Sequence, residues 1–148
     1  MKKILMGASA LVMALSLNSC SSDDNGGGVS AAKLEGKWEF SKEKFSAAGQ
    51  ALPEEDYEGN QAGCSKDYIT MSETGTYVWG DYWDSECSLD LTEGTWSLDG
   101  KTLTMTDEFG TDEMTVVSVS STKLVVKSVT TEGGIEWTER YTLTKAAQ

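Results

Sequence analysis

The 148-residue sequence contains no histidine, one proline and only three cysteines. Without histidine, Ser-His-Asp and Cys-His nucleophilic mechanisms are excluded, and the most common protein ligand of zinc is missing. Basic residues are also scarce, since 12 lysines and arginines stand against 24 aspartates and glutamates and give a formal net charge of −12. Because such a charge repels nucleic acids and anionic membrane surfaces, we expect no nucleic-acid partner.

Long hydrophobic runs are limited to one, at the N-terminus. Two lysines precede a mostly apolar stretch at residues 4–17, which is shorter than the ~20 residues of a membrane-spanning helix and typical of a signal peptide. The stretch ends in Leu17-Asn18-Ser19-Cys20, which resembles a lipobox, where a diacylglyceryl group is added to the cysteine and the chain is cut before it. We therefore expect residues 1–19 to be a lipoprotein signal peptide and Cys20 to carry the lipid, including palmitate. An ordinary signal peptide with a chance cysteine is the alternative.

The residues after Cys20 are acidic and then rich in glycine. Residues 21–25, Ser-Ser-Asp-Asp-Asn, resemble the serine-aspartate export tag of Bacteroidetes surface lipoproteins, and three glycines follow. We expect residues 20–32 to be a lipidated, flexible and disordered tether, and residues 33–148 to be one domain. The predicted location is the outer membrane, anchored by lipid and exposed at the surface, with the periplasmic face as the alternative.

Apolar and polar residues alternate with a period of two through most of the domain, which predicts an all-β fold. We expect eight strands, at residues 36–45, 67–72, 76–83, 91–98, 101–106, 111–119, 123–130 and 135–144. Asp99-Gly100 is the strongest hairpin signal, because a type I′ turn needs positive φ at both central positions. Eight consecutive strands on short turns predict an antiparallel up-and-down barrel, since closure removes exposed edges. A two-sheet sandwich is the alternative.

Because Cys20 is expected to carry the lipid, only two of the three cysteines remain in the domain and can pair with each other. Cys64 precedes the second expected strand and Cys87 follows the third, so the hairpin that turns at Gly75 brings them together. In an exported chain this pair predicts a disulfide that clamps the open end of the hairpin and contributes ~3 kcal/mol. Two free buried thiols are the alternative.

An ordered set of residues resembles a known family. Gly36-Lys37-Trp38 resembles the Gly-x-Trp signature of lipocalins. The remaining segments resemble the lipocalin-like domain of Bacteroidetes lipoproteins: Cys64, Asp67, Gly75-Thr76-Tyr77, Cys87, Gly94-Thr95-Trp96-Ser97-Leu98 and Gly100-Lys101-x-Leu103. The resemblance covers about residues 34–145 and implies a small calycin-type barrel with an unassigned ligand and no enzyme activity.

The same resemblance raises one specific contact. Lipocalins often pack an arginine of the last strand over the first-strand tryptophan, which here implies Arg140 on Trp38 as a cation–π pair at the barrel floor. Arg140 has the opposite parity to Tyr141 and Leu143, which argues against that pairing. No helix is expected after the last strand, unlike in larger lipocalins.

Alternation also predicts which side chains face the interior. The predicted inward set is Trp38, Phe40, Ile69, Met71, Tyr77, Trp79, Trp96, Leu98, Leu103, Met105, Met114, Val116, Leu124, Val126, Trp137, Tyr141 and Leu143. Because most of these side chains are bulky, they favour a packed interior over a ligand pocket. The candidate ligand-binding residues are the aromatic ones: Trp38, Tyr77, Trp79, Trp83, Trp96, Trp137 and Tyr141. Trp79 and Trp83, with Asp81 between them, would suit an apolar or sugar-like ligand at one mouth of the barrel.

Two acidic groups have the oxygen ligands that calcium prefers. They are Glu54, Glu55, Asp56 and Glu58, and Asp84, Glu86 and Asp90. Neither follows a known calcium-loop spacing, and nothing places two carboxylates at the separation that a glycosidase needs. We therefore expect solvated acidic surfaces, with no metal, no cofactor and no catalytic residue.

Two functions remain in competition, with a structural envelope component as a third. The first is a lipid-anchored binding protein for a small apolar or amphipathic ligand, which predicts a real cavity open at one end. The second is a protein-interaction or inhibitor module that acts through its loops, which predicts a filled barrel and an exposed aromatic loop, for example around Trp83. We expect a monomer in either case. An internal cavity with room for only a water or two would count against the first.

Overall fold

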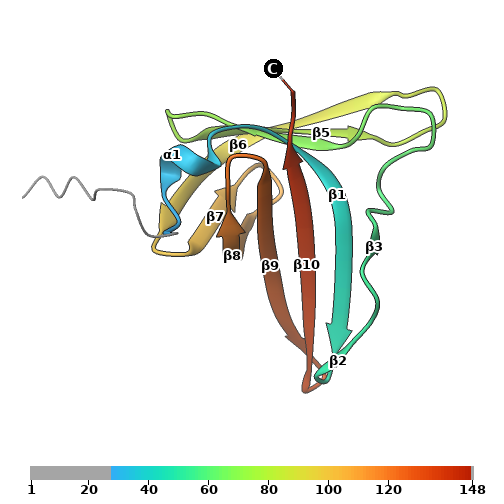
Figure 1. The fold of residues 1–148 in the computed structure, drawn as a ribbon, viewed down its shortest axis with the longest axis vertical. Coiled ribbons are helices and arrows are strands. Elements are labelled where there is room, and N and C mark those ends of the chain that lie inside the picture. The colour runs from blue at the N-terminus through green and yellow to red at the C-terminus, as the bar shows by residue number, and fades with distance from the viewer. Residues whose placement is uncertain (1–27, 148) are drawn as a thin grey trace, which may run out of the picture.

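The computed structural model describes residues 28–147, which form one short helix and ten strands (Figure 1). The elements are α1 (Ala31–Leu34), β1 (Gly36–Ala47), β2 (Gln50–Ala51), β3 (Glu55–Asp56), β4 (Tyr68–Met71), β5 (Thr76–Tyr82), β6 (Leu89–Asp99), β7 (Thr102–Thr106), β8 (Thr111–Val119), β9 (Lys123–Glu132) and β10 (Ile135–Lys145). The predicted signal peptide, the lipid-carrying Cys20 and most of the predicted tether lie outside the described residues.

Eight of these strands close into an antiparallel barrel in the order β1, β4, β5, β6, β7, β8, β9 and β10. The ring closes because β10 pairs with β1 from Trp38 opposite Lys145 to Ala47 opposite Trp137. Short strands β2 and β3 pair with the far half of β1, beyond its pairing with β4. In Figure 1, β1, β9 and β10 extend together past the rest of the barrel. The predicted eight-stranded up-and-down barrel is confirmed, and the sandwich alternative is wrong.

The strand positions agree closely with those predicted from alternation, and every boundary falls within about two residues of its expected place. The structure adds β2 and β3, which lie between the first two expected strands, and α1, which was not expected. Ala31 and Ala32, expected at the end of the tether, form the first half of α1. Within residues 28–147, no helix has the length and apolar character needed to cross a membrane.

Two hairpin turns show how glycine sets the connections. The β9–β10 turn consists of Gly133 and Gly134, both with positive φ, as a type I′ turn requires. At the β6–β7 turn, Asp99 pairs with Thr102, so Gly100 and the lysine after it form the turn, and of these only Gly100 has positive φ. The predicted hairpin is confirmed there, but Asp99-Gly100 as the centre of a type I′ turn is wrong, because the turn is displaced by one residue.

A β-bulge changes which residues of β1 face the interior. Trp38 and Phe40 are buried, but the register shifts between Phe40 and Lys42, so Glu43 is the next buried residue. A bulge inserts one unpaired residue and turns the following side chains to the other face. The far half of β1 therefore directs a carboxylate toward the interior.

Candidate functional site

Side chains fill the interior of the barrel. The buried core consists of Leu34, Trp38, Phe40, Ile69, Met71, Tyr77, Trp96, Leu103, Met105, Val116, Leu124, Val126 and Leu143. The apolar cavity that remains has a volume of about 50 Å³. Small-molecule sites usually occupy about 300–1,000 Å³, whereas this space suits no more than a few waters. The cavity counts against a ligand bound deep inside the barrel.

Four aromatic rings gather at one mouth of the barrel. The ring of Phe40 stacks on Tyr57 with centroids 4.7 Å apart, and it lies 4.9 Å from Trp79 and 6.0 Å from Tyr141. Tyr57 meets Tyr141 edge to face at 6.0 Å. Such tilted and offset arrangements are favourable for aromatic pairs. The cluster therefore caps the apolar cavity beneath it.

Tyr57 reaches this cluster from the connection between β3 and β4, which is fixed to the barrel by hydrogen bonds. Asn60 donates from Nδ2 to the carbonyl of Phe40 at 2.9 Å, and its Oδ1 accepts from the backbone N–H of Asp67 at 2.9 Å. Buried Glu43 accepts from the backbone N–H of Glu58 at 3.0 Å. Burial, followed by the nearby carboxylate of Asp67, raises the pKa of Tyr57 to about 12, so its phenol stays neutral.

A cleft of about 340 Å³ lies just outside the aromatic cluster. It is lined by Tyr57, Trp79, Asp81, Asp90, Thr92, Asp107 and Phe109. Asp81 and Asp90 are directly opposite each other on β5 and β6, so two carboxylates share this wall. Trp79 also lines the internal cavity and separates it from the cleft. The cleft combines flat aromatic surface with hydrogen-bond acceptors, and its volume falls in the range of small-ligand sites.

The floor of the cleft is held by a hydrogen bond between strand and turn. The hydroxyl of Tyr77 donates to Oδ2 of Asp107 at 2.7 Å, and Asp107 Oδ1 accepts from the backbone N–H of Phe109 at 2.8 Å. These bonds lower the pKa of Asp107, the one from Tyr77 having the largest effect. The carboxylate is therefore ionised. Phe109, in the same turn, lines the cleft and is 81 % exposed.

The opposite end of the barrel is closed around Trp38. Its indole is fully buried and donates from Nε1 to the carbonyl of Leu34 at 2.7 Å. Lys145 lies over the ring with Nζ 4.2 Å from the centroid, and Nζ donates to the carbonyl of Glu35. The Arg140 contact implied by the family resemblance is wrong, because β10 places Lys145 opposite Trp38 and Arg140 opposite Lys44.

The structure brings together only some of the seven candidate ligand-binding residues. Trp79 and Tyr141 belong to the mouth cluster, whereas Trp38, Tyr77 and Trp96 are buried in the core. Trp96 donates to the carbonyl of Ser72 at 3.1 Å, which is a structural role. Trp83 is 55 % exposed and lies outside the cleft.

The predicted inward position of Trp137 is wrong. It has the parity of Tyr141 and Leu143 but is 44 % exposed. It pairs with Ala47 and Thr130, on the part of β1, β9 and β10 that extends past the packed interior (Figure 1). Parity alone assigns a face, whereas burial also needs strands on the opposite side of the barrel.

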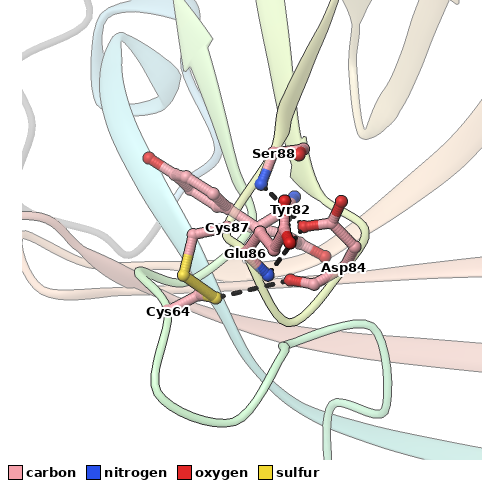
Figure 2. The surroundings of a disulfide bond; sticks show 7 residues. Cys64, Tyr82, Asp84, Glu86, Cys87 and Ser88 are labelled. Carbon is pink, nitrogen blue, oxygen red and sulfur yellow. Dashed lines mark hydrogen bonds between the residues drawn. A yellow bond between two sulfur atoms is a disulfide. The ribbon is translucent and has the colours of Figure 1, made fainter.

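The predicted disulfide is confirmed between Cys64 and Cys87, with Cα atoms 5.4 Å apart (Figure 2). It joins the connection before β4 to the β5–β6 turn. Figure 2 shows the Asp84 side chain inside that turn, where Oδ1 accepts from the backbone N–H groups of Ser88 and Glu86. These bonds, chiefly the one from Ser88, lower the pKa of Asp84. The carboxylate of Asp84 therefore stabilises the turn.

Neither acidic group forms a metal centre in the part of the chain that the structure describes, where no three Asp, Glu, Cys or His side chains converge on one point. In the first group, Asp56 instead pairs with Lys42, with Nζ 2.7 Å from Oδ1. Both partners are exposed to solvent, so this pair adds little to stability.

Tyr57 and Phe109 belong to the cleft but were not identified from the sequence. Both lie in connections without alternation, so no local pattern marked them. The only available signal was a single aromatic residue inside a strongly polar segment, which suggests a contact elsewhere in the fold.

Comparisons with known proteins agree with this architecture. A family model described as a lipocalin-like domain matches residues 34–126. A solved lipocalin-like protein from Bacteroides uniformis aligns with a TM-score of 0.52 at 15 % identity, covering 77 % of this chain and 99 % of that one. An uncharacterised protein from Bacteroides eggerthii aligns with a TM-score of 0.52 at 10 % identity, covering 76 % and 99 %. None of the curated proteins matches the sequence.

Proposed function

Because this chain belongs to the family of lipocalin-like domains, we propose that it is a binding protein for a small amphipathic molecule, which it holds at the barrel mouth. The observation that carries the proposal is the 340 Å³ cleft, in which Tyr57, Trp79 and Phe109 face a wall of carboxylates. The ligand occupies this cleft instead of the interior, which is filled.

The lining of the cleft selects the chemistry of the ligand. Aromatic faces offer stacking surface for an apolar or sugar-like body, as tryptophan and tyrosine do in many binding sites. Asp81, Asp90 and Asp107 accept hydrogen bonds and repel anions. The preferred ligand is therefore uncharged or cationic, and fatty-acid-like anions are disfavoured. The role is binding and not catalysis, in keeping with the absence of histidine.

We further propose that the protein acts at the cell envelope as a monomer, anchored by lipid on Cys20 at the outer-membrane surface, with the periplasmic face as the alternative. The lipobox-like Leu17-Asn18-Ser19-Cys20 supports this. Expression with an alkyne-labelled palmitate, followed by mass spectrometry, should place the label on the wild-type chain. Cys20→Ser should abolish it, and an equally labelled Cys20→Ser chain would contradict the anchor.

Probe binding tests the ligand site. The uncharged fluorophore N-phenyl-1-naphthylamine should bind the full chain, and the anionic fluorophore 8-anilinonaphthalene-1-sulfonate should bind far more weakly. Phe109→Ala removes a cleft residue that is 81 % exposed, so the fold should be unaffected while probe affinity falls about tenfold. Trp83→Ala removes an exposed aromatic residue outside the cleft and is the matched control.

The second candidate function is a loop-mediated interaction with another protein. The filled interior and the 55 % exposure of Trp83 favour it. If Trp83→Ala lowers probe binding while Phe109→Ala does not, the cleft is not the site and the loop becomes the better candidate.

A further inference from the structure

A second depression lies on the outer face of the barrel, away from the mouth. It has a volume of about 450 Å³ and extends over β1, β10, β9 and β8 to the β6–β7 turn. Four cationic residues line it: Lys44, Lys101, Lys127 and Arg140. No carboxylate belongs to its lining, although acidic residues outnumber basic ones two to one in the sequence. We call this depression the cation groove.

Strand register lines up the cations across the groove. Lys44 of β1 is directly opposite Arg140 of β10, and Arg140 is directly opposite Lys127 of β9. Lys127 in turn faces Thr115 of β8, next to the turn that carries Lys101. Because neighbouring strands lie ~4.8 Å apart, the backbone positions of Lys44, Arg140 and Lys127 fall within ~10 Å of one another. Like charges directly opposite each other in a sheet are destabilising. The row of Lys44, Arg140 and Lys127 therefore destabilises the sheet unless an anion binds between these side chains.

The described residues provide no such anion. Within residues 28–147, none of the four cations forms an ion pair with a carboxylate. The carboxylates next to the row in the chain, buried Glu43 and exposed Glu139, have other hydrogen-bond partners. Glu43 accepts from the backbone N–H of Glu58, and Glu139 accepts from the hydroxyl of Tyr141.

We propose that the cation groove binds a phosphate group, either as a phosphate monoester or as free phosphate. A phosphate monoester carries a charge of about −1.5 to −2 and three acceptor oxygens, which several cations can share. The guanidinium of Arg140 can donate two parallel hydrogen bonds, and the hydroxyls of Ser46 and Thr138 line the same groove. A groove of this volume also accommodates a sugar attached to the phosphate. The site is separate from the mouth cleft and does not depend on the function proposed for it.

Nuclear magnetic resonance can test this site with defined probes. The ¹⁵N-labelled full chain is titrated at constant ionic strength with inorganic phosphate and with glucose 6-phosphate, and with glucose as the neutral control. Saturable shifts are expected at the amides of Lys44, Lys127 and Arg140. Lys127→Gln and Arg140→Gln should each weaken binding about tenfold, because each removes a charged hydrogen-bond donor. Lys123→Gln, an exposed lysine on β9 outside the groove, is the matched control for charge and should bind as wild type.

The outcomes separate the sources of phosphate and decide the proposal. Saturation by both probes means that the phosphate group suffices, and saturation by glucose 6-phosphate alone means that the attached sugar is also recognised. Chemical-shift changes that do not saturate would overturn the proposal. So would a loss of binding in Lys123→Gln as large as in Lys127→Gln and Arg140→Gln. Removing one repelling charge should leave the urea midpoint unchanged or raise it. A lower midpoint in Lys127→Gln and Arg140→Gln would assign these cations to fold stability and would also overturn the proposal.

Discussion

The Cys64–Cys87 disulfide offers a prediction whose size follows from the chain itself. Replacement of both residues by serine removes a link between positions separated by 23 residues in the sequence. In the chain-entropy relation, a loop of this length lowers the entropy of the unfolded chain by roughly 11 cal/mol/K, or ~3 kcal/mol at 25 °C. The double variant should therefore lose about that much free energy of unfolding.

Urea unfolding followed by tryptophan fluorescence measures this loss. With a slope of ~1.5 kcal/mol/M for a domain of this size, the midpoint should fall by ~2 M. Wild type unfolded with a reducing agent should match the double variant, which controls for the serine substitutions themselves. A midpoint shift below ~0.5 M with an unchanged slope would refute the reasoning.

The same disulfide has a local consequence at the mouth. It ties the connection that carries Tyr57 and Asn60 to the β5–β6 turn. Its removal should increase amide hydrogen exchange in residues 57–67 more than in β8 and β9, since local opening depends on nearby constraints. Equal acceleration throughout the barrel would mean that the bond stabilises only the global fold.

Two further perturbations test packing and burial near the cleft. At Gly94, an added Cβ would lie 2.4 Å from the carbonyl oxygen of Thr106 and 2.5 Å from the ring of Tyr77. Gly94→Ala should therefore lower the free energy of unfolding in urea by ~2–3 kcal/mol. An unchanged urea midpoint would show that the neighbouring strands can move apart without loss of stability. Burial raises the pKa of the Asp67 carboxyl above its ordinary 3.8, although a hydrogen bond from the backbone N–H of Tyr82 opposes this rise. The folded state therefore holds the carboxyl proton more tightly than the unfolded state, and the stability gained from that proton is lost as pH rises through the folded-state pKa. Asp67→Asn keeps the acceptor oxygen and should therefore gain stability relative to wild type as pH rises above 3.8, the ordinary value of the carboxyl, whereas a difference independent of pH would contradict the burial effect.

The barrel strands could be predicted because their signals are local. Alternation marks each strand, and glycine marks several of the tight turns, so β8 at Thr111–Val119 matches its predicted position. The disulfide followed from the same reasoning, since Cys64 and Cys87 flank one hairpin. The one-residue displacement of the turn at Gly100 shows that the position of a turn depends on the register of the strands that it joins.

Contacts that depend on register across the barrel could not be predicted. Whether Lys145 or Arg140 covers Trp38 depends on how β10 aligns with β1, and the sequence carries no direct signal for that pairing. Tyr57 reaches Phe40 from a connection that pairing with β1 and the hydrogen bonds of Asn60 and Glu43 hold in place. The cation groove has the same origin, because its charges come from strands far apart in the sequence.

The most direct test of the mouth cleft as a ligand site is native mass spectrometry of the full chain purified from its own host. Wild type and Trp83→Ala should retain the same small molecule as a reproducible added mass, and Phe109→Ala should lose most of it. Retention of that mass by Phe109→Ala, or its loss from Trp83→Ala alone, would contradict binding in the cleft.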